Sequence, residues 1–582
     1  MVTHSKLTVV RHYDRVVGWS VLLIVLSILV GTFVGPPETH DGEISFQTTS
    51  SLWRNQSFAL DGSAQGTPEA KLLIKTAQEL QESGRGGRFP VQRGEDGEYY
   101  GWYGVGQAVV PLPLYGLGRL VAWGAPEIER RHSDDRQLGF ERSEYFAHLF
   151  VGLRNPLLTA LTAWMIVLCA RRMSVGRWGA FIAGITYCLC TFAWPQGRSW
   201  LSDVQATFFL FAGFHLILRL REERARIGLR PSVLLLLGLT LGAAVATRAV
   251  MAPAVLVLEF SALFVMFRRH LGHEALHSTA RPHGLDPGWK SLAWMAVPQV
   301  LIAALLLWVN DRRFDNPFDN GYGEVFSGGF FGYPPLLGLV GVLLSPGKGL
   351  LWLAPGILLL YWGVPLALRT SQRVWFFTTV AMTIVVLLPV ICIQGWHGAW
   401  TFGPRYLLPI LPFLWLGVAL GLEHAASHRP VAAVAAALFA LGFTINLPAV
   451  LVDTTTYHQL ATKAAPLAWT VPEELSEEDA DAWLFERTQF DWGFAAPWAH
   501  WRILRHRTAG LGEDFPVREV FFVDSDVSVR PDSTRQEGRA HFGWIDHTDR
   551  LGGRPWPALL AVGLLFAFGA ILAIIGLDHS AD

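Results

Sequence analysis

Long apolar runs recur from one end of this 582-residue chain to the other, and they restrict its fold more than any other feature. A helix needs about 20 apolar residues to cross a bilayer. The chain is 51% hydrophobic and 16% charged, whereas a soluble domain carries about a quarter charged residues. We therefore predict an all-α polytopic membrane protein with about 12 transmembrane helices, near residues 16–34, 145–170, 177–194, 203–219, 232–247, 250–267, 290–309, 350–368, 374–393, 406–422, 431–451 and 556–577.

Basic residues in the short loops predict the orientation, because Lys and Arg are enriched on the cytoplasmic side of membrane proteins. They gather at the N-terminus and in every second loop: Lys6, Arg11, Arg15, Arg171, Arg172, Arg177, Arg219, Arg221, Arg224, Arg226, Arg230, Arg268, Arg269, Lys290, Arg369 and Arg373. This pattern predicts an integral protein of the bacterial inner membrane with both termini in the cytoplasm. The periplasmic or exterior face then carries residues 35–144, 310–349, 394–405 and 453–555.

One apolar stretch, residues 103–123, is predicted not to cross the membrane. Pro111 and Pro113, together with several glycines, make it a poor straight helix, and a crossing there would turn every later basic cluster outward. We expect it to form juxtamembrane structure on the outer face. The hydrophilic residues before the last apolar run are predicted to form a small external segment. The chain then divides into a transmembrane domain (1–452, with external loop 35–144), the external segment (453–555), and a final transmembrane helix with a short cytoplasmic tail (556–582).

Some functions are disfavoured by the same sequence. A formal net charge of −1 argues against a nucleic-acid partner. Nothing resembles an ATP-binding P-loop, so any activity is driven by the substrates or by a gradient. The cysteines fall inside apolar runs, and the pair Cys188-x-Cys190 lacks the second ligand pair of a zinc site. We interpret all of them as packing residues: Cys169, Cys188, Cys190 and Cys392.

Charged residues gather at the predicted outer boundary of the membrane, where a charge is costly and by default indicates function. Asp41 and Glu43 follow the first span, Arg248 lies at the outer tip of a hairpin, and Lys348 and Arg405 lie in loops rich in Gly and Pro. The cations are on the side that the positive-inside bias disfavours. A phosphate ligand would stabilise them there, because Arg binds phosphate in bidentate fashion and Lys binds it as a point charge. The alternative is that each cation pairs with a lipid headgroup or a loop acid.

Two further polar residues on this face have open alternatives. Asp203, which follows Ser202 at the start of a span, either caps the helix or contacts a substrate. His397, between Trp396 and Gly398, is either an interface residue or a substrate contact.

Several short stretches, in this order along residues 16–450, resemble those of a known family. They are Asp41-Gly42-Glu43, the run YYGWYGVGQ at 99–107, Ser202-Asp203, LSPGKGL at 344–350 and FGPRYLLP at 402–409. Together they resemble the GT-C glycosyltransferases, close to the protein O-mannosyltransferase and aminoarabinose transferase (glycosyltransferase family 39-like) group. The chain departs from that pattern where Gly42 splits the Asp-Glu pair, and where Tyr103-Gly104 replaces consecutive prolines.

The resemblance implies that the transmembrane domain is catalytic. It would move a sugar, with inversion, from a polyprenyl-phosphate donor to a hydroxyl of a lipid, glycan or protein acceptor on the external face. Asp41 matches the general base, with Glu43 as its neighbour. Arg405, Lys348 and Arg248 are the candidate ligands of the donor phosphate. The candidate substrate contacts are Tyr103, Asp203, His397 and Tyr406.

No cofactor is predicted. Some relatives on this fold use a divalent metal, but one Asp and one Glu are too few ligands to infer one here. A transporter or flippase of a lipid-linked or anionic substrate is the alternative function, although the paired broken helices and inverted repeats typical of transporters are not evident. A non-catalytic, lipid-binding scaffold would not require the acids and cations to converge on one face.

Overall fold

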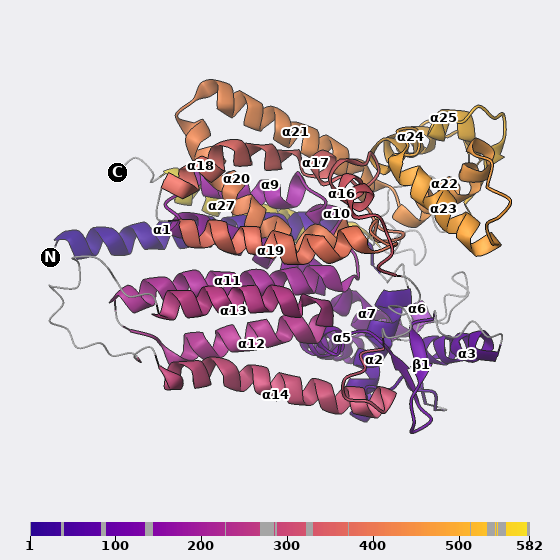
Figure 1. Cartoon of the computed structure of the whole chain (residues 1–582), viewed down its shortest axis with the longest axis horizontal. Helices are drawn as coiled ribbons and strands as arrows, with labels where there is room; N and C mark the ends of the chain where they lie inside the picture. Colours follow the sequence, from indigo (N-terminus) through magenta and orange to yellow (C-terminus); the bar gives the residue numbers. More distant parts are fainter. Residues whose placement is uncertain are drawn as a thin grey trace.

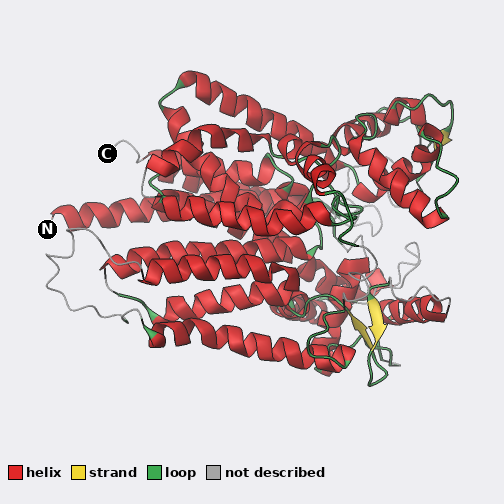
Figure 2. Cartoon of the chain, viewed as in Figure 1, coloured by secondary structure: helices red, strands yellow, loops and turns green. Residues whose placement is uncertain are grey.

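The regular structure of the described residues is helical in the computed structural model, apart from two short pairs of antiparallel strands (Figure 2). The structure describes residues 2–35, 40–63, 65–82, 89–133, 144–226, 228–267, 285, 288–321, 330–369, 372–512, 514–531, 542, 544 and 554–578.

Nine helical segments among the described residues are long and apolar enough to cross a membrane. They are Tyr13–Gly31 in α1 (Val2–Gly31); Tyr145–Arg172, formed by α7 (Tyr145–Gly152) and α8 (Arg154–Arg172); Ser202–Arg224 in α11 (Ser202–Arg226); Ala249–Phe267, formed by η3 (Ala249–Met251) and α13 (Ala252–Phe267); α14 (Trp289–Phe314); α19 (Arg373–Cys392); Arg405–Ala426, formed by η6 (Arg405–Ile410) and α20 (Leu411–Ala426); α21 (Arg429–Leu451); and α27 (Trp556–Asp578).

The other three predicted spans are shorter helices in the structure. The stretch 177–194 contains α9 (Arg177–Leu189) and a separate short helix, α10 (Ala193–Gly197). The stretch 232–247 is α12 (Pro231–Thr247), which begins at a proline. The stretch 350–368 is broken, because a proline disfavours the helical conformation of the residue before it. It contains α17 (Leu350–Leu353), η5 (Pro355–Leu359) and α18 (Leu360–Arg369), and a further short apolar helix, α16 (Pro335–Leu344), precedes it. The total of about twelve crossings therefore remains a prediction.

The last helix returns to the first. A Cβ atom at Gly569 of α27 would lie 3.0 Å from the Ile24 side chain, and one at Gly576 would lie 2.7 Å from Val17. Small residues at such positions let two membrane helices approach closely. The two chain termini lie at the same end of the bundle (Figure 1), as an even number of crossings requires. Which end faces the cytoplasm remains a prediction.

A compact layer formed within residues 40–133 lies at the end of the bundle away from the termini (Figure 1). It contains α2 (His40–Asn55), α3 (Pro68–Glu82), the antiparallel strands β1 (Val91–Arg93) and β2 (Tyr99–Gly101), α4 (Gly106–Val109), α5 (Leu112–Gly124) and α6 (Pro126–Ser133). The stretch 103–123 forms α4 and α5. At 13 residues, α5 is too short to cross. Its exposed apolar side chains, including Trp123 at 83%, are typical of a helix on a membrane surface.

The segment that follows α21, described over most of residues 453–531, lies at the same end of the bundle (Figure 1). Its elements are α22 (Thr454–Ala468), α23 (Glu477–Phe490), α24 (Ala496–Thr508), β3 (Phe515–Pro516), α25 (Val517–Phe521) and β4 (Ser528–Val529), with Phe515 opposite Val529 in the antiparallel β3–β4 pair. Most of the predicted segment after residue 531 lies outside the described residues. The predicted domain boundaries are therefore not tested.

Candidate functional site

A cavity of about 410 Å³ opens where the layer formed within residues 40–133 meets α11, α12, α14, α19 and η6. Asp41 at the start of α2 lines it. So do five other residues that the sequence predicted for the site: Tyr103, Asp203, Arg248, Arg405 and Tyr406. The fold therefore brings together side chains from five separate stretches of the chain.

Asp41 is held by a tyrosine from the turn that follows β2. The Tyr103 hydroxyl donates a hydrogen bond of 2.5 Å to Oδ1 of Asp41. Arg313, at the outer end of α14, holds this turn by donating from Nη2 to the carbonyl oxygens of Gly101 and, over 3.2 Å, Tyr103. The next residue, Gly104, packs against α12 so closely that a Cβ there would lie 2.3 Å from the Thr247 carbonyl oxygen. Glycine at 104 therefore lets the turn carry Tyr103 into the cavity.

Two of the three arginines that line the cavity, Arg248 and Arg405, flank one aromatic ring. The guanidinium carbon of Arg405 lies 4.9 Å from the centroid of the Tyr406 ring, and that of Arg248 lies 5.6 Å from it. Cation–π contacts of this kind stabilise a guanidinium charge beside an aromatic ring. Arg405 also donates to the Tyr406 hydroxyl over 3.2 Å. Arg248 directly follows α12, and its own backbone is extended there. Its side chain pairs with Asp203 in the first turn of α11.

Hydrogen-bonding capacity remains unused on this wall. Nε of Arg405 and Oδ2 of Asp203 are buried and have no hydrogen-bond partner among the described residues. Buried polar groups are normally paired, and each unpaired one costs about 1–3 kcal/mol. A donor and an acceptor of this kind beside a cavity are therefore suited to a polar ligand.

The rest of the cavity wall is apolar. It is formed by the end of α12, by η3, by α14 and α19, and by the residues that precede α16: Val245, Val250, Met251, Leu306, Phe330, Phe331, Val385, Val386, Pro389, Val390 and Ile393. Two of the helices that form this wall, α14 and α19, are candidate membrane spans. The site thus combines a charged end with a hydrocarbon-like end, which suits an amphiphilic ligand.

Glu43 does not line the cavity. It lies two residues after Asp41 on α2, and two steps of about 100° turn a side chain to the other side of a helix. Its Oε1 accepts a 2.7 Å hydrogen bond from Nε2 of Gln47 and lies 3.3 Å from Nε2 of His148. The structure therefore separates the two acids that the sequence treated as neighbours.

Lys348 also lies outside the cavity wall, although it was predicted as a phosphate ligand. Its side chain is buried (1% exposed), and Nζ donates to the carbonyl oxygens of Ala399, over 3.1 Å, and Thr401. Burial, and then the charge of Arg405, lower the pKa of Lys348 well below its ordinary value. Ala399 has a positive φ of 55°, a conformation that costs about 1–2 kcal/mol outside glycine. Lys348 therefore ties down a strained turn that leads to Arg405.

His397 belongs to this same turn and does not line the cavity. Its Nδ1 accepts a hydrogen bond of 3.1 Å from the backbone N–H of Ala399. Burial, with smaller effects of Lys348 and Arg405, lowers the pKa of His397 to about 3. The imidazole is therefore neutral at physiological pH and acts as an acceptor within the turn.

Several polar residues of the cavity were not predicted from the sequence as site residues, among them Asn310, Arg313 and Asn320. Arg313 could have been found, since it is another cation on the face that the positive-inside bias disfavours. The two asparagines carry no sequence signal of this kind. Within the described parts of the chain, no cluster of three or more His, Cys, Asp or Glu side chains could hold a metal ion.

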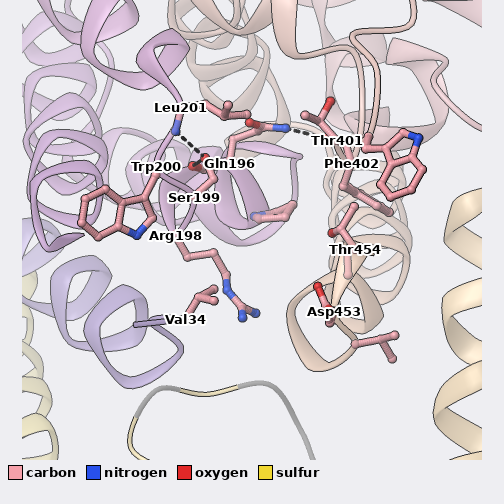
Figure 3. A pocket seen from close by; sticks show the side chains of 14 residues that line it. Val34, Gln196, Arg198, Ser199, Trp200, Leu201, Thr401, Phe402, Asp453 and Thr454 are labelled. Carbon is pink, nitrogen blue, oxygen red and sulfur yellow. Dashed lines mark hydrogen bonds between the residues drawn. The ribbon is translucent and has the colours of Figure 1, made fainter. Parts of the chain in front are cut away.

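A second, smaller cavity of about 60 Å³ lies behind Trp200 and Leu201, which line both cavities. Figure 3 shows Gln196 above and Arg198 reaching in from one side, with Asp453 opposite. The side-chain amide of Gln196 donates to the Phe402 carbonyl over 2.7 Å. A space of this size holds only a few water molecules. The larger cavity is therefore the candidate functional site.

Comparisons with known proteins give one structural match to report. No protein-family model and no curated protein matches the chain. Among solved structures, the chain matches the crystal structure of ArnT from Cupriavidus metallidurans bound to undecaprenyl phosphate. The match covers 96% of this chain and 75% of the ArnT chain, with 11% sequence identity and a TM-score of 0.38. A similarity at this level assigns no activity to the chain, so its function is inferred from the cavity.

Proposed function

We propose that the protein is a membrane glycosyltransferase that moves a sugar from a polyprenyl-phosphate donor to an acceptor hydroxyl on the external face. One observation carries the proposal: a single cavity places the Asp41 carboxylate, the Arg248 and Arg405 guanidinium groups and an apolar wall around one space. A lipid-linked sugar phosphate needs each of these parts. Its hydrocarbon tail fits the apolar wall, its phosphate anion fits the guanidinium groups, and the carboxylate serves the reaction at its sugar carbon.

The donor binds across the two ends of the cavity. Its isoprenoid chain lies against the apolar wall between α14 and α19, and its phosphate lies at Arg405, whose Nε is available to donate. Arg248, which is paired with Asp203, is a second guanidinium group that lines the same cavity. As the bond between the anomeric carbon and the phosphate breaks, negative charge grows on the leaving phosphate. The arginines then stabilise the transition state more than the ground state, which is the condition for catalysis.

Asp41 acts as the general base. The acceptor hydroxyl gives its proton to the carboxylate while its oxygen attacks the anomeric carbon from the side opposite the phosphate. One C–O bond forms, the C–O bond to phosphate breaks, and the configuration inverts. The hydrogen bond from Tyr103 holds Asp41 in position for this transfer. General-base catalysis contributes a rate factor of about 10²–10⁴.

The test uses the purified full chain in proteoliposomes, with polyprenyl-phosphate donors carrying radiolabelled sugars and a membrane extract as the source of acceptors. We expect the label to move from the donor to an acceptor, with the release of polyprenyl phosphate. A flippase would instead carry the intact labelled lipid across the bilayer without forming a product. Translocation without transfer across a broad panel of sugars would therefore overturn the proposal.

A further inference from the structure

Helix α24 presents a mixed aromatic and cationic face away from the protein core. Trp498 is 39% exposed, and Arg505, seven residues later, is exposed. Residues three and seven apart share one face of a helix, so Trp501 belongs to this face as well. The opposite face, with Ala499, Ile503 and His506, is buried. Trp and Arg on one face, with the core on the other, are typical of helices that lie at a membrane surface.

Trp501 connects α24 to a helix of the membrane bundle. Its indole N–H donates a hydrogen bond of 3.0 Å to the carbonyl oxygen of Thr444 in α21. In an α-helix this carbonyl would accept from the residue four positions later, but that residue is Pro448, which has no N–H. An unsatisfied carbonyl costs several kcal/mol where no water can reach it. Trp501 therefore replaces the donor that Pro448 removes from α21.

The position of this hydrogen bond along α21 sets the depth of α24. At 23 residues, α21 is about 34 Å long, and the hydrocarbon core of a bilayer is about 30 Å thick. Thr444 precedes the end of the helix at Leu451 by about 10 Å. The Trp501 ring is thus at the outer boundary between headgroups and hydrocarbon. Interfacial helices bury their apolar face to about this depth, 5–10 Å.

Two other exposed tryptophans, Trp352 and Trp492, also lie beside an apolar helix. Trp352 in α17 and Trp492, which precedes α24, are 38% and 54% exposed, and their ring centroids lie 5.4 Å apart. Trp352 follows the apolar helix α16, and its indole donates to the Leu344 carbonyl at the end of that helix. The exposed aromatic surface is therefore continuous with helices of the bundle.

We propose that α24 is an interfacial helix that docks the segment 453–531 onto the phospholipid headgroups of the outer leaflet. Trp498 and Trp501 lie at the boundary between headgroups and hydrocarbon, and Arg505 faces the lipid phosphates. The docked segment also braces the site turns, because the Gly347 N–H donates to the Gln489 carbonyl over 3.1 Å and the His458 ring stacks on Trp400 at 5.6 Å. This docking does not depend on the transfer reaction proposed above.

Spin labels report the docking directly. The full chain, with Cys392→Ala to remove the cysteine that is only partly buried, carries one label at Trp498→Cys, at Arg505→Cys or at the control position Asp526→Cys. The Asp526 side chain is 93% exposed and lies in the stretch between α25 and β4, outside α24. The protein is reconstituted in nanodiscs of phosphatidylcholine and phosphatidylglycerol. Power-saturation EPR then measures collisions of each label with oxygen, which enters lipid, and with a nickel chelate, which stays in water.

We expect labels at 498 and 505 to collide with oxygen several-fold more, relative to the nickel chelate, than the label at 526. Neither labelled position replaces Trp501, so the hydrogen bond to α21 is preserved. Water-like accessibility at 498 and 505, equal to that at 526, would overturn the proposal. Shielding from both reagents, with spin–spin broadening that grows with protein concentration, would also overturn it and would assign the face to a second copy of the chain.

Discussion

Tyr103 donates a hydrogen bond of 2.5 Å to Oδ1 of Asp41, from a position 62 residues away in the chain. The bond joins the start of α2 to the turn after β2, and both residues line the large cavity. One oxygen of the carboxylate is thereby oriented by the protein, while the cavity provides room for an acceptor hydroxyl beside it. The predictions below follow from this geometry and from the turn that carries Arg405.

The first prediction concerns the base. Asp41→Asn retains the shape and much of the hydrogen bonding but removes the proton acceptor. We expect turnover to fall at least about a hundredfold, the lower end of general-base catalysis, while donor affinity is retained. Glu43→Gln is the matched control, since Glu43 faces Gln47 and His148 rather than the cavity. Turnover per folded protein is the measurement. Normal turnover in Asp41→Asn, with a large loss of turnover in Glu43→Gln, would show that Glu43 and not Asp41 is the base.

The second prediction concerns the phosphate. Arg405→Ala removes a charge-assisted hydrogen bond worth about 1.5–3 kcal/mol, so we expect donor affinity to fall by about 10–100-fold and turnover to fall as well. Arg405→Lys keeps the charge but loses the bidentate fork, and we expect an intermediate loss. Arg312→Ala, an exposed arginine at the outer end of α14, is the control. Equal donor affinity in Arg405→Ala and Arg312→Ala would exclude Arg405 as the ligand.

The third prediction separates two roles for Lys348. Lys348→Met preserves the volume but leaves the carbonyl oxygens of Ala399 and Thr401 without their donor. We expect a loss of about 1–3 kcal/mol in stability, seen as a lower apparent Tm in detergent, together with a partial loss of donor affinity. A direct phosphate ligand would behave differently. In that case affinity would fall while the apparent Tm stayed at the wild-type value.

The fourth prediction concerns acid stability. Burial lowers the pKa of His500 from 6.5 to about 4, against a raising effect of its hydrogen bond to the Ala496 carbonyl. The folded state therefore holds the ring neutral at pH values where the unfolded state protonates it. Stability is complete above about pH 6.5 and falls as the pH drops toward 4, by up to about 3 kcal/mol.

His500→Phe keeps an aromatic ring against Tyr457 and cannot take up a proton. We therefore expect its apparent Tm to fall less than that of the wild type between pH 7 and pH 4.5. His428→Phe, at an exposed position, is the control and should keep the wild-type acid dependence. A wild-type acid dependence in His500→Phe as well would show that His500 is not the titrating group.

The sequence alone indicated the helical membrane character of the chain and the outer-boundary stretches that carry Asp41, Arg248 and Arg405. Apolar length and the distribution of basic residues are local properties that follow from transfer of side chains between water and lipid, so they can be read without knowing any contact. The same reasoning kept residues 103–123 out of the membrane, and the structure divides them into helices too short to cross. The helix breaks that divide two of the predicted spans, 177–194 and 350–368, depend on the backbone conformation of single residues.

Only the tertiary structure decided which of these charges share a cavity. Glu43 turns away because residues 40–55 form a helix, and Lys348 turns inward because the carbonyl oxygens of a turn some 50 residues later accept its hydrogen bonds. Arg313 enters the site because α14 ends beside β2. The direction and burial of a side chain depend on the packing of segments that are distant in the chain, and neither composition nor spacing records that packing.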